Sequence, residues 1–343
     1  MFEPRFTITS RLLANVKRIG IIIADLNGRR FDKLSLVKLE KSARELSSYS
    51  STSIEGNPLP LTDVKIIIKN QPKNLRDSEK EIVNYNTALE FLDQNIKLKT
   101  PSFNTNLILK IQKQVTLGLI SAGNSGKLRS APVFVNNPAL KKTVYLPPNH
   151  QDVKDLMDEL IRFIAKNIDD LDPLILAGIF HKQFVIIHPF IDGNGRTARL
   201  ATKVLLANMG LDMFNLFSFE NYYNQNVTKY FSKVGILGNY YDINDKVDFT
   251  DWLEYFTDGI IDELLRVSKI LEKEKVSPET TLKSYHQNII DYIVQNGFIA
   301  DRDYAKLTDR AKPTRNNDFN KLISLGLIER LGKGKATYYK LKG

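Results

Sequence analysis

The chain has 343 residues, 42% hydrophobic and 26% charged, which is typical of a globular protein large enough for two or three domains. It contains no cysteine, so disulfides, thiolate metal sites and cysteine redox chemistry are excluded, and its four histidines leave little for a histidine-rich metal cage. No apolar run approaches the roughly 18 residues that span a bilayer. The N-terminus, MFEPRFTITSRLLANVK, lacks the apolar core of a signal peptide, and we therefore expect a cytoplasmic protein without membrane contact.

The net charge of +10 is unevenly distributed along the chain. From Thr281 to the C-terminus there are twelve basic and six acidic side chains, so this short segment carries +6 of the excess. Such an asymmetry suits contact with a polyanion, although a solvated basic surface has the same composition.

Most of the chain has the apolar spacing of helices, which predicts a mainly α fold. Ser78 followed by Glu81 predicts a capping box, and the prolines of the stretch 57–60 predict the end of an earlier helix. The expected helices cover residues 33–49, 78–95, 104–118, 151–167, 172–187, 195–209, 221–233 and 249–274.

The segment between Lys127 and Asn149 has a different pattern. It contains the β-favouring runs 133–135 (VFV) and 143–145 (TVY) on either side of a turn-prone Asn-Asn-Pro. We expect a β-hairpin here, ended by Pro147 and Pro148.

The C-terminal part reads as a separate module. A charged, proline-containing linker is expected over 273–280. It is followed by predicted helices at 282–296, 301–308 and 314–325 and by two short strands around a Gly-Lys-Gly-Lys turn. Three helices followed by a hairpin is the order of a winged helix-turn-helix, so we expect that domain over 281–343.

The stretch His188–Arg199 (HPFIDGNGRTAR) has the properties of a phosphate site. Gly193 and Gly195 allow close approach to the backbone, and the amides of a Gly-Asn-Gly loop that opens a helix bind anions. Arg196 and Arg199 are three residues apart and share one helix face, so that both can grip phosphates.

The same stretch supplies a base and a metal ligand. His188 has a natural pKa suited to proton abstraction near neutral pH, and Asp192 offers the hard oxygen that Mg²⁺ prefers when it bridges phosphates. The alternative is a packed histidine beside an ordinary helix start, but several distinct requirements coincide within twelve residues. The stretch therefore predicts phosphoryl or nucleotidyl transfer.

Residues 188–199 match every position of the Fic family signature, HxFx(D/E)GNGRxxR, and the chain resembles that family over roughly residues 1–270. His181–Phe184 and the expected hairpin, which is similar to the family's target-binding flap, agree with this. The resemblance implies a fido-type helical core, here 101–272, behind an N-terminal helical region, here 1–100. The intact GNGR favours AMP transfer from ATP over the phosphorylation of the related Doc-type kinases.

The resemblance also implies a role for each motif position. His188 would deprotonate a Tyr, Ser or Thr hydroxyl of a target protein, and Asp192 would hold Mg²⁺ between the α- and β-phosphates of ATP. Phe190 would anchor the loop. The phosphates would be bound by the backbone amides of Gly193, Asn194 and Gly195 and by the side chains of Arg196 and Arg199.

Further positions are assigned by similarity to the family. Tyr230 resembles the aromatic residue that packs on adenine, with core packing as the equal alternative, and Asn239 is a candidate for the base or ribose. The target-binding flap would present Val133, Phe134, Val135, Val144 and Tyr145.

The segment Ser51–Asn57 matches the Fic inhibitory motif (S/T)xxxE(G/N), with Ser51, Glu55 and Gly56 at its defining positions. Alone the pattern is short, and Glu55 could be an ordinary surface carboxylate. Ahead of a full Fic signature it implies that Glu55 pairs with Arg199 and takes the place of the γ-phosphate. We therefore expect an auto-inhibited enzyme. In a variant hypothesis, Glu55 also positions a water molecule that removes AMP from modified target proteins.

The predicted winged helix would read DNA through helix 314–325 and its wing. Arg and Asn side chains read base edges and lysines contact phosphates, but Asp318 lies on the same helix and many winged helices bind only proteins. The alternative interpretation of the whole chain is a DNA-binding regulator with a nucleotide-sensing or AMP-removing Fic domain. Formation of a homodimer is a further possibility. The candidate DNA contacts are Arg315, Asn316, Lys321, Lys333 and Lys335.

Overall fold

The computed structural model describes residues 2–29, 33–98, 103–137, 142–212, 214–273 and 282–342. The chain divides into two compact units, one formed by residues 1–29 and 42–269 and the other by 30–41 and 270–343. Among the described helices, none combines the length and the apolar character that crossing a membrane requires.

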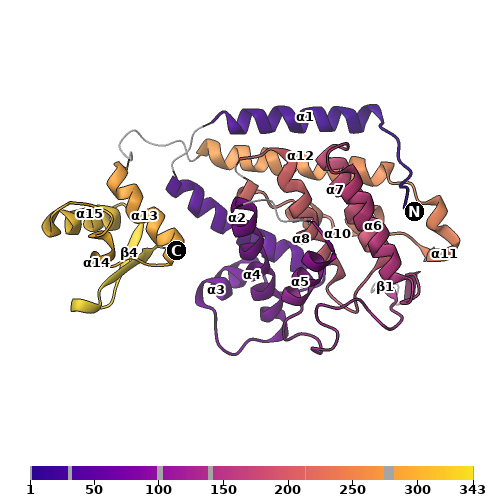
Figure 1. Ribbon diagram of the computed structural model, residues 1–343, viewed down its shortest axis with the longest axis horizontal. Helices are drawn as coiled ribbons and strands as arrows, with labels where there is room; N and C mark the ends of the chain where they lie inside the picture. The colour runs from indigo at the N-terminus through magenta and orange to yellow at the C-terminus, as the bar shows by residue number, and fades with distance from the viewer. Residues whose placement is uncertain are drawn as a thin grey trace. The chain divides into compact units, whose positions relative to one another are not determined.

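The first unit is mainly helical, as predicted, and its centre is α7 (Figure 1). This helix is apolar on all sides and nearly every residue in it is buried, which is the pattern of a helix enclosed by others. It packs against α6 and α8. The helices that lie wholly or mainly in this unit are α1 (Ser10–Asn27), α2 (Lys33–Ile54), α3 (Leu61–Asn70), α4 (Asp77–Leu98), α5 (Thr105–Val115), α6 (Val153–Asn167), α7 (Pro173–Ile187), α8 (Asn194–Leu206), α9 (Glu220–Gln225), α10 (Val227–Val234), α11 (Tyr240–Ile243) and α12 (Thr250–Lys273).

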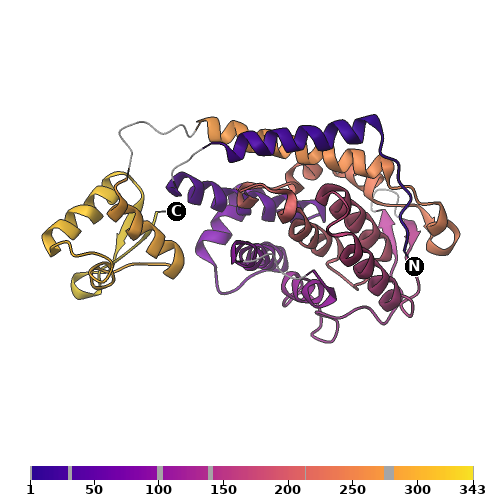
Figure 2. The same ribbon diagram turned by 45° about the horizontal axis from the view of Figure 1, so that its top comes forward.

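The long helix α12 closes this unit against both α7 and α1. Trp252 donates from its indole nitrogen to the carbonyl of Gly178, 2.8 Å away, and a Cβ at residue 178 would lie 2.6 Å from Leu253. Glycine at this position therefore allows the two helices to approach closely. Helix α1 runs beside α12 in both views (Figures 1 and 2), and Arg11 pairs with Asp258 at 2.6 Å.

The predicted hairpin is present, and it belongs to a three-stranded sheet. Strands β1 (Val135–Asn137) and β2 (Lys142–Leu146) pair antiparallel, and residues 138–141 at their turn lie outside the described residues. Strand β3 (Gly238–Asn239) adds in parallel to β2, with Gly238 opposite Tyr145. The sequence had not predicted this third strand.

Several helix boundaries differ from the predictions. The segment 221–233 is two helices, because Asn226 interrupts it and its side chain caps α10 by accepting from the amide of Lys229 at 2.9 Å. Helix α4 begins at Asp77, so that Ser78 and Glu81 lie inside it and the expected Ser78–Glu81 capping box is wrong. The Glu79 carboxylate accepts from the Arg76 amide at 2.8 Å at this helix start. Helices α1 and α3 were not predicted.

Helix α2 also runs five residues further than predicted, to Ile54. Its later turns bury hydroxyl side chains in place of the apolar stripe that the prediction relied on. The fully or almost fully buried hydroxyl residues are Ser47, Ser48, Ser50, Ser51 and Thr52. Because the prediction relied on apolar periodicity, it placed the end of the helix too early.

The second unit has its own core, centred on Phe319, Leu322 and Tyr339. Its helices and strands follow the predicted order, and Ile299 forms an isolated bridge to Tyr339. Helix α15 begins at Lys312, two residues before the predicted start at 314, with Pro313 in its first turn. The elements are α13 (Ser284–Asn296), α14 (Asp301–Tyr304), α15 (Lys312–Ser324), β4 (Ile328–Leu331) and β5 (Tyr338–Leu341).

That the second unit is a winged helix stays a prediction, as do the domain limits 1–100, 101–272 and 281–343. The predicted linker 273–280 lies almost wholly outside the described residues. The first two predicted segments pack as parts of the same compact unit.

Candidate active site

His188 ends helix α7 in a left-handed conformation, with φ 50° and ψ 60°. Few non-glycine residues adopt this backbone, and here the His188 amide donates to the carbonyl of Phe184 at 3.0 Å. The ring nitrogen Nδ1 lies 3.2 Å from the carbonyl of Val185, which can only accept, so Nδ1 carries the proton. Nε2 is then the basic nitrogen. Burial lowers the pKa of His188, which keeps the ring neutral at physiological pH.

The loop that follows is held by Asn194. Its side-chain oxygen accepts from the amide of Phe190 at 2.9 Å, and its side-chain nitrogen donates to the Phe190 carbonyl at 2.8 Å. Phe190 is fully buried, as an anchor should be. Gly193 has φ +80°, and a Cβ there would also meet Thr116 at 2.8 Å. The loop therefore has one well-defined shape, and its glycine is required twice over.

The N-terminus of α8 lies under the carboxylate of Glu55. A Cβ built on Gly195 would overlap Oε1 of Glu55, so this carboxylate sits directly on the glycine backbone at the start of the helix. A helix N-terminus with glycines is where an anion is stabilised by backbone amides and the helix dipole. Glu55 is thus the anion at this position in the structure.

Arg199 is fully buried and is held by the same segment. Its Nε donates to Oγ of Ser51 and its Nη2 to the Ser51 carbonyl, both at 2.8 Å, and Nη2 also lies 2.7 Å from Oε1 of Glu55. Burial alone would lower the pKa of Arg199, but Glu55 together with Tyr230 and Tyr85 outweighs it, and the pKa is raised. Nη1 is buried without a hydrogen-bond partner among the described residues, so one donor of this arginine is unused.

Arg196 has two carboxylate partners. Its Nη2 lies 3.0 Å from Asp192, and its Nη1 lies 3.2 Å from Glu81 of helix α4. The arginine side chain is 4% exposed, whereas that of Asp192 is 46% exposed. The sequence had assigned Glu81 only a capping role, and no local pattern connects it with a residue 115 positions later.

The acidic side chains fit a metal that is shared with phosphates. No cluster of three or more acidic or histidine side chains that could hold a metal occurs among the described residues. Mg²⁺ commonly takes one or two carboxylates together with phosphate oxygens and water. Half-exposed Asp192, beside the start of α8, satisfies that requirement, provided that Arg196 gives up part of its contact.

Arg129 connects His188 to both ends of the flap, and sequence analysis missed it. Its Nε donates to the His188 carbonyl at 2.8 Å, its Nη1 to Ala131 at 3.2 Å and its Nη2 to Pro148 at 2.5 Å. Its amide donates to the carbonyl of Pro189 at 2.9 Å. Arg129 is buried, and this burial lowers its pKa. Because every acceptor is a backbone carbonyl, no side-chain pattern in the sequence could have revealed it.

Among the predicted flap residues, only Phe134 is exposed, at 60%, and it precedes strand β1. Val133, Val135 and Val144 are half-buried. Tyr145 is buried, and its hydroxyl donates to the carbonyl of Ile186 at 2.9 Å. Its ring packs into the first unit against Ile186 and Tyr240, and the role of the hairpin as a target-binding flap stays a prediction.

Tyr230 lies in the core, which is the alternative given for it above. It is 1% exposed, its ring stacks on Tyr223, and its hydroxyl lies 2.9 Å from Nε2 of His181. Asn239 caps α11 by accepting from the amide of Tyr241 at 3.0 Å. That either residue contacts the nucleotide stays a prediction.

The candidate DNA contacts in the second unit differ in whether their side chains are already bound within the protein. Arg315 makes two hydrogen bonds to Asp301, at 2.8 and 3.0 Å, and its contact with DNA stays a prediction. Asp318 is buried and accepts from Tyr304 and Arg310, which explains an acid on this helix. Three other predicted DNA contacts are exposed: Asn316, Lys321 and Lys333. The side chain of Lys335 lies outside the described residues.

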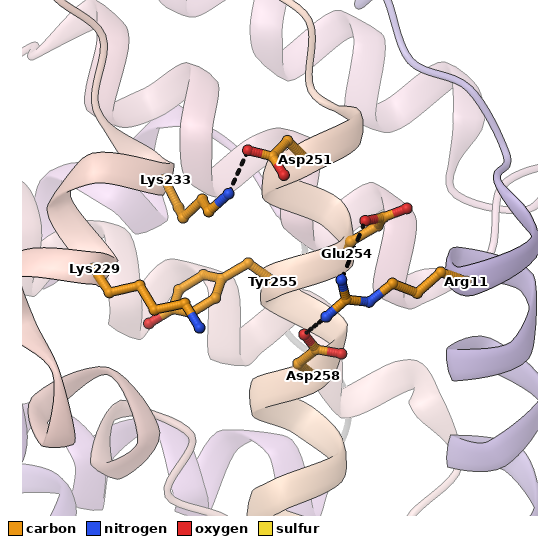
Figure 3. Close-up of a pocket in the computed structure, with 7 residues that line it drawn as sticks. All are labelled: Arg11, Lys229, Lys233, Asp251, Glu254, Tyr255 and Asp258. Carbon is orange, nitrogen blue, oxygen red and sulfur yellow. Dashed lines mark hydrogen bonds and ion pairs between the residues drawn. The ribbon is translucent and has the colours of Figure 1, made fainter.

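A small pocket of about 100 Å³ lies elsewhere on the first unit, between α1, α10 and α12 (Figure 3). Its charges neutralise one another, since Arg11 pairs with Asp258 and Lys233 with Asp251, while Lys229 lies over the ring of Tyr255. No residue of the 188–199 stretch lines it. It therefore carries neither the base nor the anion site described above.

Comparison with known proteins agrees with this geometry. Residues 102–206 match the model of the Fic/DOC family. The curated relatives include the protein adenylyltransferases Fic of Aedes aegypti, 28% identical over 221 residues, and of Nematostella vectensis, 28% identical over 222 residues. Each match covers 59% of this chain, but only 42% and 50% of the respective relative. The chain thus spans half or less of the length of these relatives.

Two solved structures share the fold. A Fic family protein from Desulfovibrio desulfuricans G20 aligns over 100% of this chain and 99% of its own, with a TM-score of 0.66 and 22% identity. A Fic domain-containing signaling protein from Bacteroides thetaiotaomicron VPI-5482 aligns over 77% of this chain and 98% of its own, with a TM-score of 0.63 and 20% identity.

Proposed function

We propose that this chain, whose residues 102–206 form a Fic domain, is an auto-inhibited protein adenylyltransferase that moves AMP from ATP onto a hydroxyl side chain of a target protein. The observation that carries the proposal is the position of Glu55, an anion seated on the glycines of α8 and paired with Arg199, close to a histidine with a free basic nitrogen. The curated relatives bear the name of this activity.

The chemistry follows from the base and the anion site. Nε2 of His188 takes the proton of a Tyr, Ser or Thr hydroxyl as its oxygen attacks the α-phosphorus of ATP. The new O–P bond forms, the bond from the α-phosphorus to the bridging oxygen breaks, and pyrophosphate leaves with that oxygen. The α8 amides and Arg199 stabilise the phosphate charge, and the rigid loop at Asn194 fixes their positions beforehand.

Mg²⁺ bound at Asp192 would neutralise phosphate charge in the complex with ATP. The half-exposed carboxylate supports this assignment, and Arg196 remains beside it as a second cation. The unused Nη1 of Arg199 provides a donor for a phosphate oxygen without loss of an existing hydrogen bond.

The resting state is inhibited because Glu55 and a nucleotide phosphate compete for the same donors. With Glu55 in place, the β- and γ-phosphates of ATP cannot occupy both the α8 amides and Arg199. The Ser51 contacts hold the helix that carries Glu55 in register with Arg199. The brake and the catalytic site therefore belong to the same chain.

The test is self-labelling with ATP labelled at the α-phosphate. Glu55→Gly should label well above wild type, and adding His188→Ala to Glu55→Gly should abolish the signal. Label that persists without His188, or that is no higher without Glu55, contradicts the proposal. Mass spectrometry of a lysate treated with the Glu55→Gly variant would then identify the targets and the modified residue.

AMP removal is the second candidate, and the half-exposed Glu55 carboxylate near His188 favours it as a group that could position water. Release of AMP from a pre-modified protein, lost in Glu55→Gly, would support this reaction. A DNA-binding role for the second unit rests on exposed Lys321 and Lys333, and a salt-dependent shift of duplex DNA would test it.

A further inference from the structure

The two carboxylate partners of Arg196 come from different parts of the fold. Asp192 belongs to the signature loop, whereas Glu81 lies on α4 and reaches Nη1 from the other side of the guanidinium at 3.2 Å. The arginine side chain is almost completely buried, so a state in which it loses every anionic partner is strongly disfavoured.

Glu81 is itself held by the segment that carries the inhibitory residue. Asn57 donates from Nδ2 to Oε2 of Glu81 at 2.7 Å and to the carbonyl of Ser78 at 2.8 Å. Asn57 follows Glu55 by two residues, and its amide is bonded to Thr52 within the end of α2. A short chain of contacts thus joins the inhibitory segment through Glu81 to Arg196.

This arrangement matters when Asp192 becomes a metal ligand. Both oxygens of Asp192 are within 3.2 Å of Nη2 of Arg196, so Mg²⁺ bound at this carboxylate would share it with the arginine and weaken their contact. Glu81 is then the carboxylate that stays with Arg196. Without it, Arg196 would either keep Asp192 or remain a buried charge without an anion.

We propose that Glu81 is a positioning residue for the metal site: it retains Arg196 when Asp192 turns to Mg²⁺, and through Asn57 it ties this arginine to the inhibitory segment. The inference rests on the proposed function, since it assumes that nucleotide and Mg²⁺ bind at the 188–199 loop. It assigns to α4 a part in a site that is otherwise formed by α2, α7 and α8.

The test uses the full chain with Glu55→Gly as the parent, so that binding and labelling are both measurable. Adding Glu81→Gln, which removes the charge and keeps the shape, should raise the Mg²⁺ concentration for half-maximal labelling by about tenfold or more, as loss of a partner behind a metal ligand does. Calorimetry with ADP gives a second readout: affinity should fall by about tenfold with Mg²⁺ present and by less than about threefold with EDTA.

Glu79→Gln is the matched control, because Glu79 lies on α4 like Glu81. The substitution weakens its ion pair with exposed Arg76 and should change neither readout. Glu81→Asp, which keeps the charge, should recover part of the Mg²⁺ dependence. Asn57→Asp is a second route to the same effect, since it keeps the oxygen that accepts from Leu59 and places a like charge against Glu81.

The outcomes separate the two proposals. If the parent neither labels itself nor binds ADP with Mg²⁺, the proposed function fails. If the parent does both, and Glu81→Gln and Asn57→Asp leave its Mg²⁺ dependence unchanged, the role of Glu81 is wrong. Equal losses of ADP affinity with and without Mg²⁺ would also overturn it, because they would mean a general defect of the pocket.

Discussion

The carboxylate of Glu55 lies 2.7 Å from Nη2 of Arg199 and covers the backbone of Gly195, so one side chain blocks both the arginine and the glycines of the candidate phosphate site. Arg199 in turn is fully buried, and it is hydrogen-bonded to α2 through the side chain and the carbonyl of Ser51. In the proposed function, the guanidinium of Arg199 therefore takes part both in phosphate binding and in inhibition.

Removal of Glu55 should activate the protein. In Glu55→Gly the start of α8 is uncovered and Nη2 of Arg199 loses its carboxylate partner, so that phosphates can use it together with the already unused Nη1. Self-labelling should rise by at least about tenfold, the effect of regaining one charge-assisted hydrogen bond. The measurement is incorporation of label from α-labelled ATP at fixed time. Glu40→Gly, on the same helix and away from the loop, is the control; an equal rise there would mean that any loosening of α2 activates.

A stability measurement can locate Glu55 without any assay of activity. Gly195→Ala places a Cβ where Oε1 of Glu55 lies, so it should destabilise the wild type by about 1–3 kcal/mol through overpacking. In the Glu55→Gly background the overlap with Glu55 is gone and only Nη1 of Arg199, 3.1 Å from the Cβ, remains close, so the same substitution should cost clearly less than in the wild type.

Urea unfolding of the four proteins in this cycle gives the coupling between the two sites. A coupling free energy near zero would show that Glu55 does not rest on Gly195 in solution. Gly210→Ala, at a left-handed glycine with open space around it, is the reference for a cost that should not depend on Glu55.

The 188–199 stretch could be interpreted from sequence because its parts are contiguous and lie on one loop and one helix turn. Glu81 and Arg129 could not, for two physical reasons. They reach the loop from 115 and 59 residues away, and Arg129 acts through backbone carbonyls that every residue possesses. Only the packing of α4, α7 and α8 brings such groups together.

The fold was predicted best where apolar spacing decides the structure. Helix α7 and its neighbours were found, whereas α2 was cut short because its buried face consists of serines. Tyr145 was assigned to the flap surface because the sequence does not say which face of the hairpin packs inward. The hydrogen bond from its hydroxyl to the carbonyl of Ile186 shows that Tyr145 is on the inward face.

The pH dependence of labelling should reflect a base with a lowered pKa. Burial, opposed in part by Glu55, keeps the pKa of His188 below its usual 6.5. Since only neutral His188 accepts a proton, labelling should be flat above pH 6.5 and fall only as the pH drops through the lower pKa. In Glu55→Gly a charge that raises the pKa is gone, so the fall should lie at still lower pH.

Labelling rates of Glu55→Gly and Glu55→Asp between pH 4.5 and 8, a range of about two units on either side of the histidine value, would test this. NMR titration of His188 gives the same pKa without catalysis. An acidic limb centred above 6.5 in Glu55→Gly, or a limb at higher pH in Glu55→Gly than in Glu55→Asp, is incompatible with the proposed environment.

Arg129 should control how well His188 is aligned. In the Glu55→Gly background, Arg129→Lys leaves one ammonium where a planar group served three carbonyls, so His188 loses its support. We expect kcat for labelling to fall by about 10- to 100-fold, as small misplacements of catalytic groups do, with KM for ATP little changed. Arg162→Lys, an exposed arginine bonded to one carbonyl, should have no effect.

In the second unit Arg315 should prove structural. Its side chain is 13% exposed and its two bonds to Asp301 join the start of α14 to α15. Arg315→Ala should therefore lower the stability of this unit, Asp301→Ala should lower it similarly, and the double variant should cost much less than the sum of the two.

DNA binding, if the unit has it, should then depend on other residues. Lys321→Ala and Lys333→Ala remove exposed charges and should each reduce the salt dependence of duplex DNA affinity by about one unit of slope, with unfolding unchanged. Arg315→Lys keeps a cation beside Asp301 and should leave DNA affinity near wild type. If instead Arg315→Lys abolishes a gel shift that Lys321→Ala and Lys333→Ala leave intact, Arg315 leaves Asp301 to contact DNA, and its structural assignment is wrong.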